Sequence, residues 1–433
     1  MLRGMNPRPP SGASRRAFLR RSLVGALSLA WWGGWGGRVL GANDRVRLAF
    51  MGTNGRGSDL IRGFAALPDA EIAAVCDVDE RAVGKGMQAA GAGRTPNRAR
   101  DVRRVLEDRN IDALVIAAPD HWHAPAAILA CAAGKHVYVE KPASHNPREG
   151  ELAVAAARRF RRVVQVGTQR RSFPAIIEAI GLVRQGGIGP VRFARAWYTN
   201  ARGSIGRGRT APVPVWLDWP LWQGPAPAVP YRDIVVHYNW HWFWHWGTGE
   251  MGNNGIHALD LCRWGLGVTY ARKVTSAGGR YHFRDDQETP DTQTATFDFG
   301  DAAIAWEGRS CQRHGVDGLG FGVAFHGEKG TLVTDGTGYR RFDLDDKEVE
   351  KVAGTGGEAA HLRDFLECVR TGARPAADIE EGHQSTLLCH LGNIAWRTGR
   401  TLRCDPVTGR ILHDSGAARL WRRNYQPGWE PKV

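Results

Sequence analysis

The sequence predicts an α/β domain built on a parallel sheet, followed by an α+β domain with an open, mostly antiparallel sheet. Between residue 45 and about residue 168, apolar strand-like runs alternate with amphipathic helix-like runs, which is typical of a parallel sheet covered on both faces. After residue 169, strand-like runs follow one another with few helices between them, which indicates antiparallel pairing. The length of 433 residues is enough for two such domains. We expect the first domain at residues 43–168 and the second at 169–433, with the helices near the carboxyl terminus packing back.

The first domain shows a regular alternation of element types. Its expected strands are 46–51, 71–76, 112–117, 136–140 and 163–167. The expected helices are 59–67, 80–90, 101–108, 124–133 and 147–160. Strand–helix–strand units of this kind place successive strands in parallel.

The second domain has a different texture. We expect helices at 175–184, 255–264, 361–370 and 379–397. The expected strands are 191–198, 274–281, 292–299, 302–309, 322–326, 330–334 and 340–343. A stretch from 200 to 249, rich in Pro, Gly and Trp, predicts an irregular segment between them.

The first residues carry a targeting pattern. Arg15 and Arg16 precede Phe18 and Leu19, and a weakly apolar run follows over residues 22–37. This pattern is typical of a twin-arginine export signal, whose pathway carries proteins that are already folded. The run is too short and too rich in glycine to span a membrane stably. We therefore expect residues 1–42 to engage the twin-arginine export machinery and the protein to be periplasmic or otherwise exported. An uncleaved arm and an amphipathic helix of the folded domain are the alternatives.

Charge and cysteine content narrow the class of protein. The formal net charge of +14 falls to +7 beyond residue 42, because residues 1–42 carry seven arginines and no acidic residue. The remaining excess is spread out and forms no basic-aromatic motif, so we expect no nucleic-acid partner. None of the seven cysteines forms a C-x-x-C pair. Folding in the reducing cytoplasm before export favours buried apolar thiols over disulfides.

A glycine-rich turn follows the first expected strand. Gly52 and Gly57 fit the outer glycines of the G-x-G-x-x-G dinucleotide turn, Asn54 takes the middle place, and Gly55 is adjacent. Such a turn lets a pyrophosphate approach a helix amino terminus. Asp77 ends the next strand, 20 residues beyond Gly57, where a carboxylate accepts the ribose hydroxyls and repels a 2′-phosphate. The sequence therefore predicts a Rossmann domain that binds NAD, with NADP less favoured.

A polar loop follows the third long strand. It reads Pro119-Asp120-His121-Trp122-His123. Ligands of parallel sheets lie beyond the carboxyl ends of the strands, so we expect this loop to face the ligand crevice. An Asp cap on the following helix is the alternative, and both roles are compatible.

Several motifs together resemble the glucose–fructose oxidoreductase / inositol dehydrogenase (Gfo/Idh/MocA) family. They are the glycine turn with Arg56, Asp77, the 119–123 loop, Glu140-Lys141-Pro142, the 219–225 segment, Gly255-Ile256-His257-Ala258-Leu259-Asp260 and the 379–383 segment. The resemblance covers nearly all of the chain beyond residue 42, most closely to exported members. It implies hydride transfer between a nicotinamide and a sugar or polyol carbon, and self-association through the open sheet. The cofactor-binding residues that we expect are Gly52, Asn54, Gly55, Arg56, Gly57, Asp77, Pro119, Asp120, His123, Glu140 and Lys141.

The resemblance also implies a catalytic pair, Lys141 and His257. A lysine beside a cationic nicotinamide in a closed cleft has a lowered pKa and can share a proton with a developing alkoxide. The family pattern Asp-x-x-x-His appears here with Asn253 in place of the aspartate. Asn253 can orient His257 from one helical turn away but cannot stabilise an imidazolium by charge. We therefore expect more of the proton work to fall on Lys141.

The remaining substrate candidates come from the second domain. We expect Arg170, Asn253, His257, Asp260 and Trp222 to contact substrate, although Arg170 or its neighbour Arg171 could equally form a surface ion pair. Of the 17 tryptophans, seven lie between 216 and 246, where they either roof a sugar site or pack beneath the loop. Three histidines at 237, 241 and 245 have helical spacing, but no carboxylate or cysteine completes a set, so we expect no metal.

Three functions remain open at this point. The first is an exported NAD(P)-dependent oxidoreductase acting on a sugar, sugar acid or cyclitol, with a tightly bound cofactor recycled in the site. The second is a redox-neutral glycoside hydrolase or lyase on the same fold. The third is a sugar-binding protein without catalysis.

Overall fold

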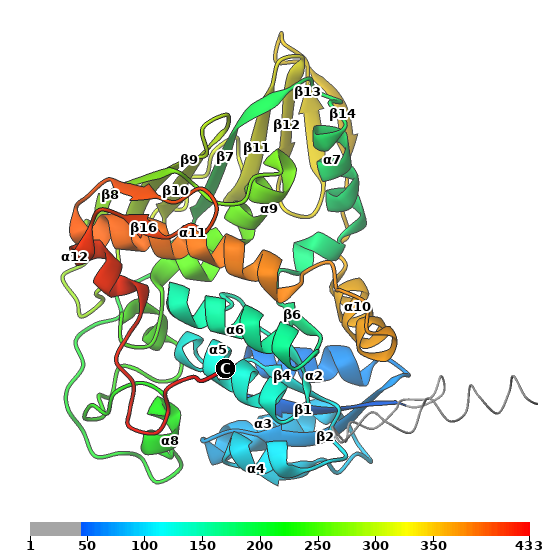
Figure 1. Cartoon of the computed structure of the whole chain (residues 1–433), viewed down its shortest axis with the longest axis vertical. Helices are drawn as coiled ribbons and strands as arrows, with labels where there is room; N and C mark the ends of the chain where they lie inside the picture. Colours follow the sequence, from blue (N-terminus) through cyan, green and yellow to red (C-terminus); the bar gives the residue numbers. More distant parts are fainter. Residues whose placement is uncertain (1–44) are drawn as a thin grey trace, which may run out of the picture. The chain divides into compact units, whose positions relative to one another are not determined.

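The computed structural model describes residues 45–433, and the expected export signal at 1–42 lies outside this range. The expected fold class is confirmed: a parallel-sheet domain is followed by a mixed, mostly antiparallel sheet domain (Figure 1). No helix in the described part of the chain combines the length and apolarity needed to cross a membrane. All seven cysteines are free thiols, and six of them are buried.

The first sheet has six strands in the order β3-β2-β1-β4-β5-β6, and every pair is parallel. Their bounds are Val46–Met51 (β1), Ala70–Cys76 (β2), Asn97–Ala99 (β3), Ala113–Ile116 (β4), His136–Val139 (β5) and Val164–Val166 (β6). The order reverses between β1 and β4, where a ligand crevice opens in folds of this type. The long strands agree with the sequence prediction, and the three-residue β3 was missed because it buries none of its residues fully.

Helices cover both faces of this sheet. They are α2 (Arg56–Ala65), α3 (Glu80–Ala90), α4 (Val102–Glu107), α5 (Asp120–Ala132) and α6 (Pro147–Arg159). The side chains of Asp79, Asp101 and Asn146 cap α3, α4 and α6 by accepting a backbone N–H. Helix α5 starts at Asp120, four residues before the expected start at 124, so the 119–123 loop is largely its first turn.

The second sheet has ten strands in the order β14-β13-β12-β11-β7-β10-β9-β8-β15-β16. Only β7 and β10 pair in parallel; the other pairs are antiparallel. Their bounds are Val191–Thr199 (β7), Lys273–Gly279 (β8), Thr292–Asp298 (β9), Ala303–Arg309 (β10), Phe321–Gly327 (β11), Gly330–Thr334 (β12), Tyr339–Phe342 (β13), Glu348–Val352 (β14), Leu402–Cys404 (β15) and Ile411–Leu412 (β16). The sequence missed β14, β15 and β16, which are short edge strands with weak apolar patterns.

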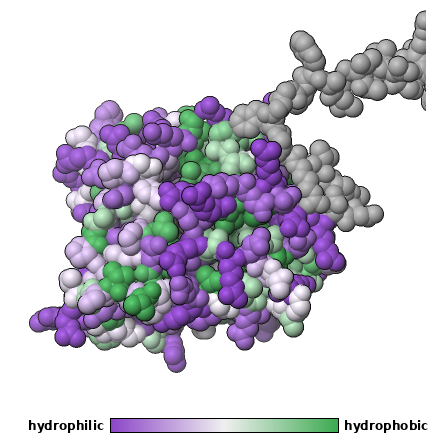
Figure 2. Space-filling view, turned by 90° about the horizontal axis from the view of Figure 1, so that it is seen from below, coloured by the Kyte–Doolittle hydropathy of each residue, from purple (hydrophilic) through white to green (hydrophobic). Residues whose placement is uncertain are grey.

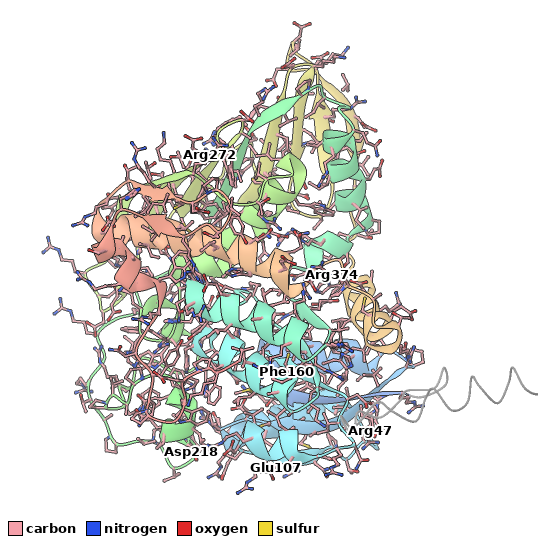
Figure 3. The ribbon with its side chains drawn as sticks, in the orientation of Figure 1. Arg47, Glu107, Phe160, Asp218, Arg272 and Arg374 are labelled. Carbon is pink, nitrogen blue, oxygen red and sulfur yellow. The ribbon has the colours of Figure 1, made fainter. Side chains whose placement is uncertain are left out.

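Helices α7 (Pro174–Arg184), α9 (Ile256–Leu266) and α11 (Ile379–Thr398) form one apolar core with this sheet. Helix α11 also contacts α6, and α10 (Glu358–Thr371) places Leu362 and Phe365 in one core with Phe64 of α2. Arg374, labelled in Figure 3, lies in the link between α10 and α11 and pairs with Asp378, the N-cap of α11. Two late helices thus pack against the parallel-sheet domain.

The segment between β7 and α9 is irregular. It contains α8 (Trp219–Gln223), capped by Asp218 (labelled in Figure 3), and the 3₁₀ turn Asn239–Trp242. Trp219, Trp222, Trp240 and Trp246 are buried together, and the rings of Trp219 and Trp222 stack with centroids 4.8 Å apart. Most of these tryptophans therefore pack beneath the loop. Seen from below, the molecule presents a mainly hydrophilic face with apolar residues in small groups (Figure 2).

Candidate functional site

A cavity of about 580 Å³ lies at the carboxyl ends of β1, β2, β4 and β5. We call it the first cavity. Of the residues predicted to bind cofactor or substrate, twelve line it: Gly52, Asn54, Gly55, Arg56, Asp77, Pro119, Asp120, His123, Glu140, Lys141, Trp222 and Asn253. Gly57, Arg170, His257 and Asp260 are not among the lining residues.

The glycine turn is shaped by close backbone packing. Gly52 has φ +82°, and a Cβ there would lie 2.6 Å from the amide nitrogen of Ala118. A Cβ on Gly57 would lie 1.7 Å from the carbonyl oxygen of Gly52, so Gly57 fixes the turn without lining the cavity. No atom of residues 45–433 lies within 4 Å of a Cβ placed on Gly55. The turn therefore leaves the amino terminus of α2 open to the cavity, as a pyrophosphate requires.

The carboxylate of Asp77 is held at the end of β2 by two backbone donors. Oδ2 accepts from the Thr53 N–H at 2.7 Å, and Oδ1 accepts from the Asp79 N–H at 3.0 Å. Burial raises the pKa of Asp77, and these two donors act against the rise. A carboxylate has further lone pairs, so Asp77 remains able to accept ribose hydroxyls.

Arg56 and Glu140 support one another at the cavity wall. The Nε of Arg56 donates to Glu140 Oε1 at 2.7 Å, and a terminal nitrogen pairs with Glu358 of α10. The pKa of buried Glu140 is lowered; burial opposes this, and the charges of Arg56 and Lys141 outweigh it. Both residues line the cavity, but their charges are largely committed to each other. This leaves them a positioning role beside Lys141.

The 119–123 loop faces the cavity as expected. Asp120 is buried and accepts from the Thr248 hydroxyl at 2.6 Å, and burial raises its pKa. Both ring nitrogens of His123 lie against carbonyl oxygens, those of Pro142 at 2.6 Å and Ala118 at 2.7 Å. His123 therefore joins the loop to the segment that follows Lys141.

Lys141 and Asn253 meet directly. The Lys141 Nζ donates to the backbone carbonyl of Asn253 at 2.8 Å and to its side-chain oxygen at 3.1 Å. Asn253 belongs to a π-helical turn, Met251–Gly255, that precedes α9; the sequence predicted an α-helical start at 255. Turns of this type often occur at functional sites. Burial lowers the pKa of Lys141, although the charges of Glu140, Asp120 and Glu250 act against the lowering.

Glu250 is a buried carboxylate next to this pair that the sequence reasoning missed. It accepts from Arg202 Nε at 2.7 Å and from the side-chain amides of Asn253 (3.4 Å) and Asn254. The amide nitrogen of Asn253 thus faces Glu250, and its oxygen faces Lys141. Glu250 therefore does not take the place of the family aspartate as a direct partner of Lys141. Its carboxylate is paired with Arg202 instead.

His257 lies one turn beyond Asn253 on α9 and is 8% exposed. Its Nδ1 is buried without a hydrogen-bond partner among residues 45–433. Burial, together with the positive charges of Arg170 and Lys141, lowers its pKa well below the ordinary value. Burial of the His257 ring therefore disfavours its charged form.

Two expected substrate residues lie elsewhere. Asp260 is 1% exposed and accepts from Arg171 and from the Ser385 hydroxyl, so the structure gives it a buried structural role between α9 and α11. Arg170 places its guanidinium over Phe321, 4.2 Å from the ring centroid, and burial lowers its pKa to about 10. Arg171 forms an ion pair with Asp260, but this pair is buried, whereas the sequence offered a surface ion pair as the alternative.

Other lining residues were not singled out from the sequence. They are Met51, Cys76, Val78, Arg100, Ala117, Ala118, Gln169 and Tyr238; Trp240, one of the seven tryptophans considered as a roof over a sugar site, also lines the cavity. Tyr238 and Trp240 come from the irregular segment, which carries no periodic pattern that could place them. In the described part of the chain no three His, Cys, Asp or Glu side chains are placed to hold a metal. His237 and His245 have separate partners, Asp79 and the carbonyl of Pro227.

Comparison with known proteins agrees with this geometry. Residues 46–168 match the family model described as oxidoreductase family, NAD-binding Rossmann fold, and residues 219–402 match its C-terminal alpha/beta domain. The chain belongs to the Gfo/Idh/MocA oxidoreductase family, and the predicted NAD-binding domain is confirmed.

Relatives within the family differ in their named activities. "Inositol 2-dehydrogenase 2" of Saccharopolyspora erythraea is 29% identical over 58% of this chain and 62% of its own length. A "glycosyl hydrolase family 109 protein" of Shewanella pealeana is 29% identical over 38% of this chain and 37% of its own. The chain thus spans less than two thirds of these curated relatives.

Solved structures share the fold at low identity. Levoglucosan dehydrogenase in complex with NADH and levoglucosan has a TM-score of 0.66 at 18% identity, covering 83% of this chain and 99% of that one. The aldose-aldose oxidoreductase of Caulobacter crescentus, complexed with glycerol, gives 0.65 at 20% identity with the same coverage.

Proposed function

We propose that the protein is an NAD-dependent oxidoreductase that transfers hydride to or from a hydroxyl-bearing carbon of a sugar, sugar acid or cyclitol. The observation that carries this proposal is the environment of Lys141. Its ammonium lies in the wall of a cavity that fits NAD, and its two hydrogen-bond partners in the described chain are both oxygens of Asn253. A lysine without a carboxylate partner, and with a lowered pKa, is suited to exchanging a proton with a substrate hydroxyl.

Each residue has a defined role in this proposal. When bound, NAD supplies or accepts the hydride. The open amino terminus of α2 and Asp77 hold the dinucleotide, and Glu140 with Arg56 fixes the segment that carries Lys141. Lys141 holds or releases the hydroxyl proton at Nζ. Asn253 fixes the direction of the ammonium, and neutral His257 serves as the second proton acceptor.

Turnover with a panel of substrates tests this function. Purified protein with NAD is incubated with aldoses, aldonic acids and inositols, and absorbance at the NADH maximum is followed. We expect at least one polyol or sugar to reduce NAD to NADH. If none exchanges hydride, even from deuterated substrate to bound cofactor, the oxidoreductase proposal fails.

Export and cofactor retention form a second part of the proposal. Arg15 and Arg16 with the apolar run support twin-arginine export of the folded protein, and NAD is scarce outside the cytoplasm. We propose that the cofactor travels bound and is recycled within the site by a second substrate. Mass spectrometry of denatured protein recovered from the periplasm should find one dinucleotide per chain; an empty protein would contradict this.

Self-association is proposed on the second sheet. Helices α7, α9 and α11 form the core on one face, while Phe193 of β7 is 40% exposed and stacks on His326 of β11. A stacked aromatic pair left in solvent on an open sheet favours a partner copy. Light scattering of the purified protein should then give an oligomer mass.

A redox-neutral glycosidase is the second candidate, favoured by the relatives named as glycosyl hydrolase family 109 proteins. Oxidation at a ring carbon would acidify its neighbour, elimination would release the aglycone, and water would add to the double bond that is left before the hydride returns to the carbonyl carbon. Nitrophenyl glycosides without an added acceptor separate the candidates: nitrophenol release without net NADH indicates cleavage. A sugar-binding protein without catalysis would show tight binding with neither signal.

A further inference from the structure

A second cavity of about 390 Å³ lies apart from the NAD-fitting one. We call it the second cavity. Its wall combines four arginines with an aromatic face: Arg397 of α11, Arg419, Arg422 and Arg423 of the carboxyl-terminal segment, and Trp244 of the irregular segment. No Asp or Glu is among the lining residues. A cavity with this much positive charge and no lining acid selects for an anion.

The arginines are not neutralised by ion pairs. In the described chain, none of the four forms a salt bridge with a carboxylate. Two carboxylates that act on them through space are already engaged: Glu149 accepts from the Tyr425 hydroxyl and the His145 N–H, and Glu288 accepts from the Trp244 N–H. Burial lowers the pKa of Arg423 and of Arg397, and Glu149 and Glu288 respectively act against the lowering. Arg423 is partly buried and Arg397, Arg419 and Arg422 are exposed; cations without paired acids are stabilised by a ligand anion.

Hydrogen bonds hold the guanidinium of Arg423 in position without using all of its N–H donors. One terminal nitrogen donates to the ring Nδ1 of His145 at 3.1 Å, and the other donates to the carbonyl of His245 at 3.0 Å. A guanidinium carries five N–H groups, and Nε uses one on the carbonyl of Asn424 at 3.3 Å. Two N–H groups, one on each terminal nitrogen, remain for a ligand. Because Arg can only donate, His145 Nδ1 is an acceptor, and the neutral ring adds no competing charge.

Trp244 supplies the apolar component of the wall. Arg397 lies over its ring, 4.8 Å from the centroid. Indole faces pack on the C–H faces of sugar rings, and guanidinium groups bind planar or tetrahedral oxyanions.

We propose that the second cavity is a binding site for an oxyanion group, either free or carried on a sugar. The site lies beside the proposed active site, because Thr248 joins both cavities. Thr248 lines the second cavity, accepts from Asn393 of the same wall at 2.8 Å, and donates to Asp120 of the first cavity. The proposal does not rest on the hydride-transfer function, since the site is defined by its own residues.

Calorimetry with protein saturated in NAD tests the site, because NAD occupies the dinucleotide turn and removes it as a competing phosphate site. Inorganic phosphate and sulfate should each bind once per chain. In an Arg397→Gln/Arg422→Gln variant, affinity should fall about tenfold or more, the cost of losing charge-assisted contacts. Both arginines are largely exposed, so the fold should persist, and NAD content measures this directly.

The matched control is Arg207→Gln/Arg403→Gln, which removes the same charge at exposed positions outside the cavity. Equal weakening in both variants, or no binding to the wild type, would overturn the proposal. Binding of glucose 6-phosphate, glucuronate and glucose shows whether the ligand is a free oxyanion or an oxyanion group carried on a sugar. Tighter binding of either charged sugar than of the free ions indicates an oxyanion carried on a sugar, and equal binding indicates a free ion. Binding of neutral glucose with the same loss in the cavity variant would contradict anion recognition.

Discussion

The two halves of the first cavity are built in different ways. The cofactor half, residues 52–57 with Asp77, comes from one turn and the next strand end, and backbone packing fixes it. The chemical half, Lys141, Asn253, Asp120 and Trp222, comes from four segments spread over both domains, and side-chain hydrogen bonds to other side chains and to backbone carbonyls hold it. Substitutions in the cofactor half should therefore lower the affinity for NAD, by steric clash or by loss of a contact with the cofactor. Substitutions in the chemical half should instead change proton transfer and so lower kcat.

The largest effect is expected at Lys141. Lys141→Ala, or His257→Ala, should lower kcat by about a hundredfold or more, the usual contribution of a positioned acid–base group. NAD affinity should stay unchanged, because neither substitution touches the turn. Steady-state kinetics and NAD titration measure the two effects separately, with Lys273→Ala, at the exposed first residue of β8, as control. If both variants kept the full kcat, neither Lys141 nor His257 would be an acid–base group, and the chemical half would have no separate catalytic role.

Gly57→Ala should weaken NAD binding by a steric clash within the turn. Its Cβ would lie 1.7 Å from the Gly52 carbonyl, so the turn must shift, and we expect NAD affinity to fall by about 2 kcal/mol, roughly thirtyfold. Gly84→Ala is the matched control, because Gly84 lies in the middle of α3, does not line the cavity, and has no atom of the described residues within 4 Å of a Cβ placed there. NAD titration by protein fluorescence gives both values. Equal losses in the two variants would indicate that the turn is not fixed by packing.

Asp77→Asn should alter cofactor choice. The amide keeps an oxygen for the Thr53 N–H but loses the charge that accepts ribose hydroxyls and repels a 2′-phosphate. We expect NAD affinity to fall about tenfold and the preference over NADP to shrink by a similar factor. Asp59→Asn, at an exposed position of α2, should change neither affinity. An unchanged preference would exclude Asp77 from ribose recognition.

The smallest effect is expected at Asn253, and it appears in the pH profile. Burial lowers the pKa of Lys141 from 10.5, so the rate of alcohol oxidation should rise with pH along a limb below that value. Asn253→Asp puts a carboxylate at the ammonium, favours its charged form, and should move the limb to higher pH by about one unit. Asn254→Asp adds the same charge beside Glu250 but not at Lys141, and should move it less. A shift to lower pH in Asn253→Asp would contradict the assignment of the limb to Lys141.

The sequence by itself determined the fold class, the NAD-binding turn and the family, because these depend on local patterns. Apolar periodicity specifies strands and helices, and the turn needs glycine at position 52, where φ is +82°, and at position 57, where the carbonyl of Gly52 leaves no room for a Cβ. Ten of the twelve expected site residues that line the first cavity come from the parallel-sheet domain, where the carboxyl ends of the strands meet at one edge of the sheet; Trp222 and Asn253 come from the second domain.

Only the tertiary structure decided which polar residues are structural and which face the cavity. Asp260 and Asp120 are both buried aspartates, but only Asp120 lines the first cavity. The carboxylate of Asp260 accepts hydrogen bonds from Arg171 and Ser385, which the packing of α9 and α11 places beside it. The contact of Lys141 with the Asn253 carbonyl, the carboxylate of Glu250 and the arginine-lined second cavity all join residues more than a hundred positions apart or from irregular segments. Long-range packing creates these environments, and no local pattern in the chain encodes them.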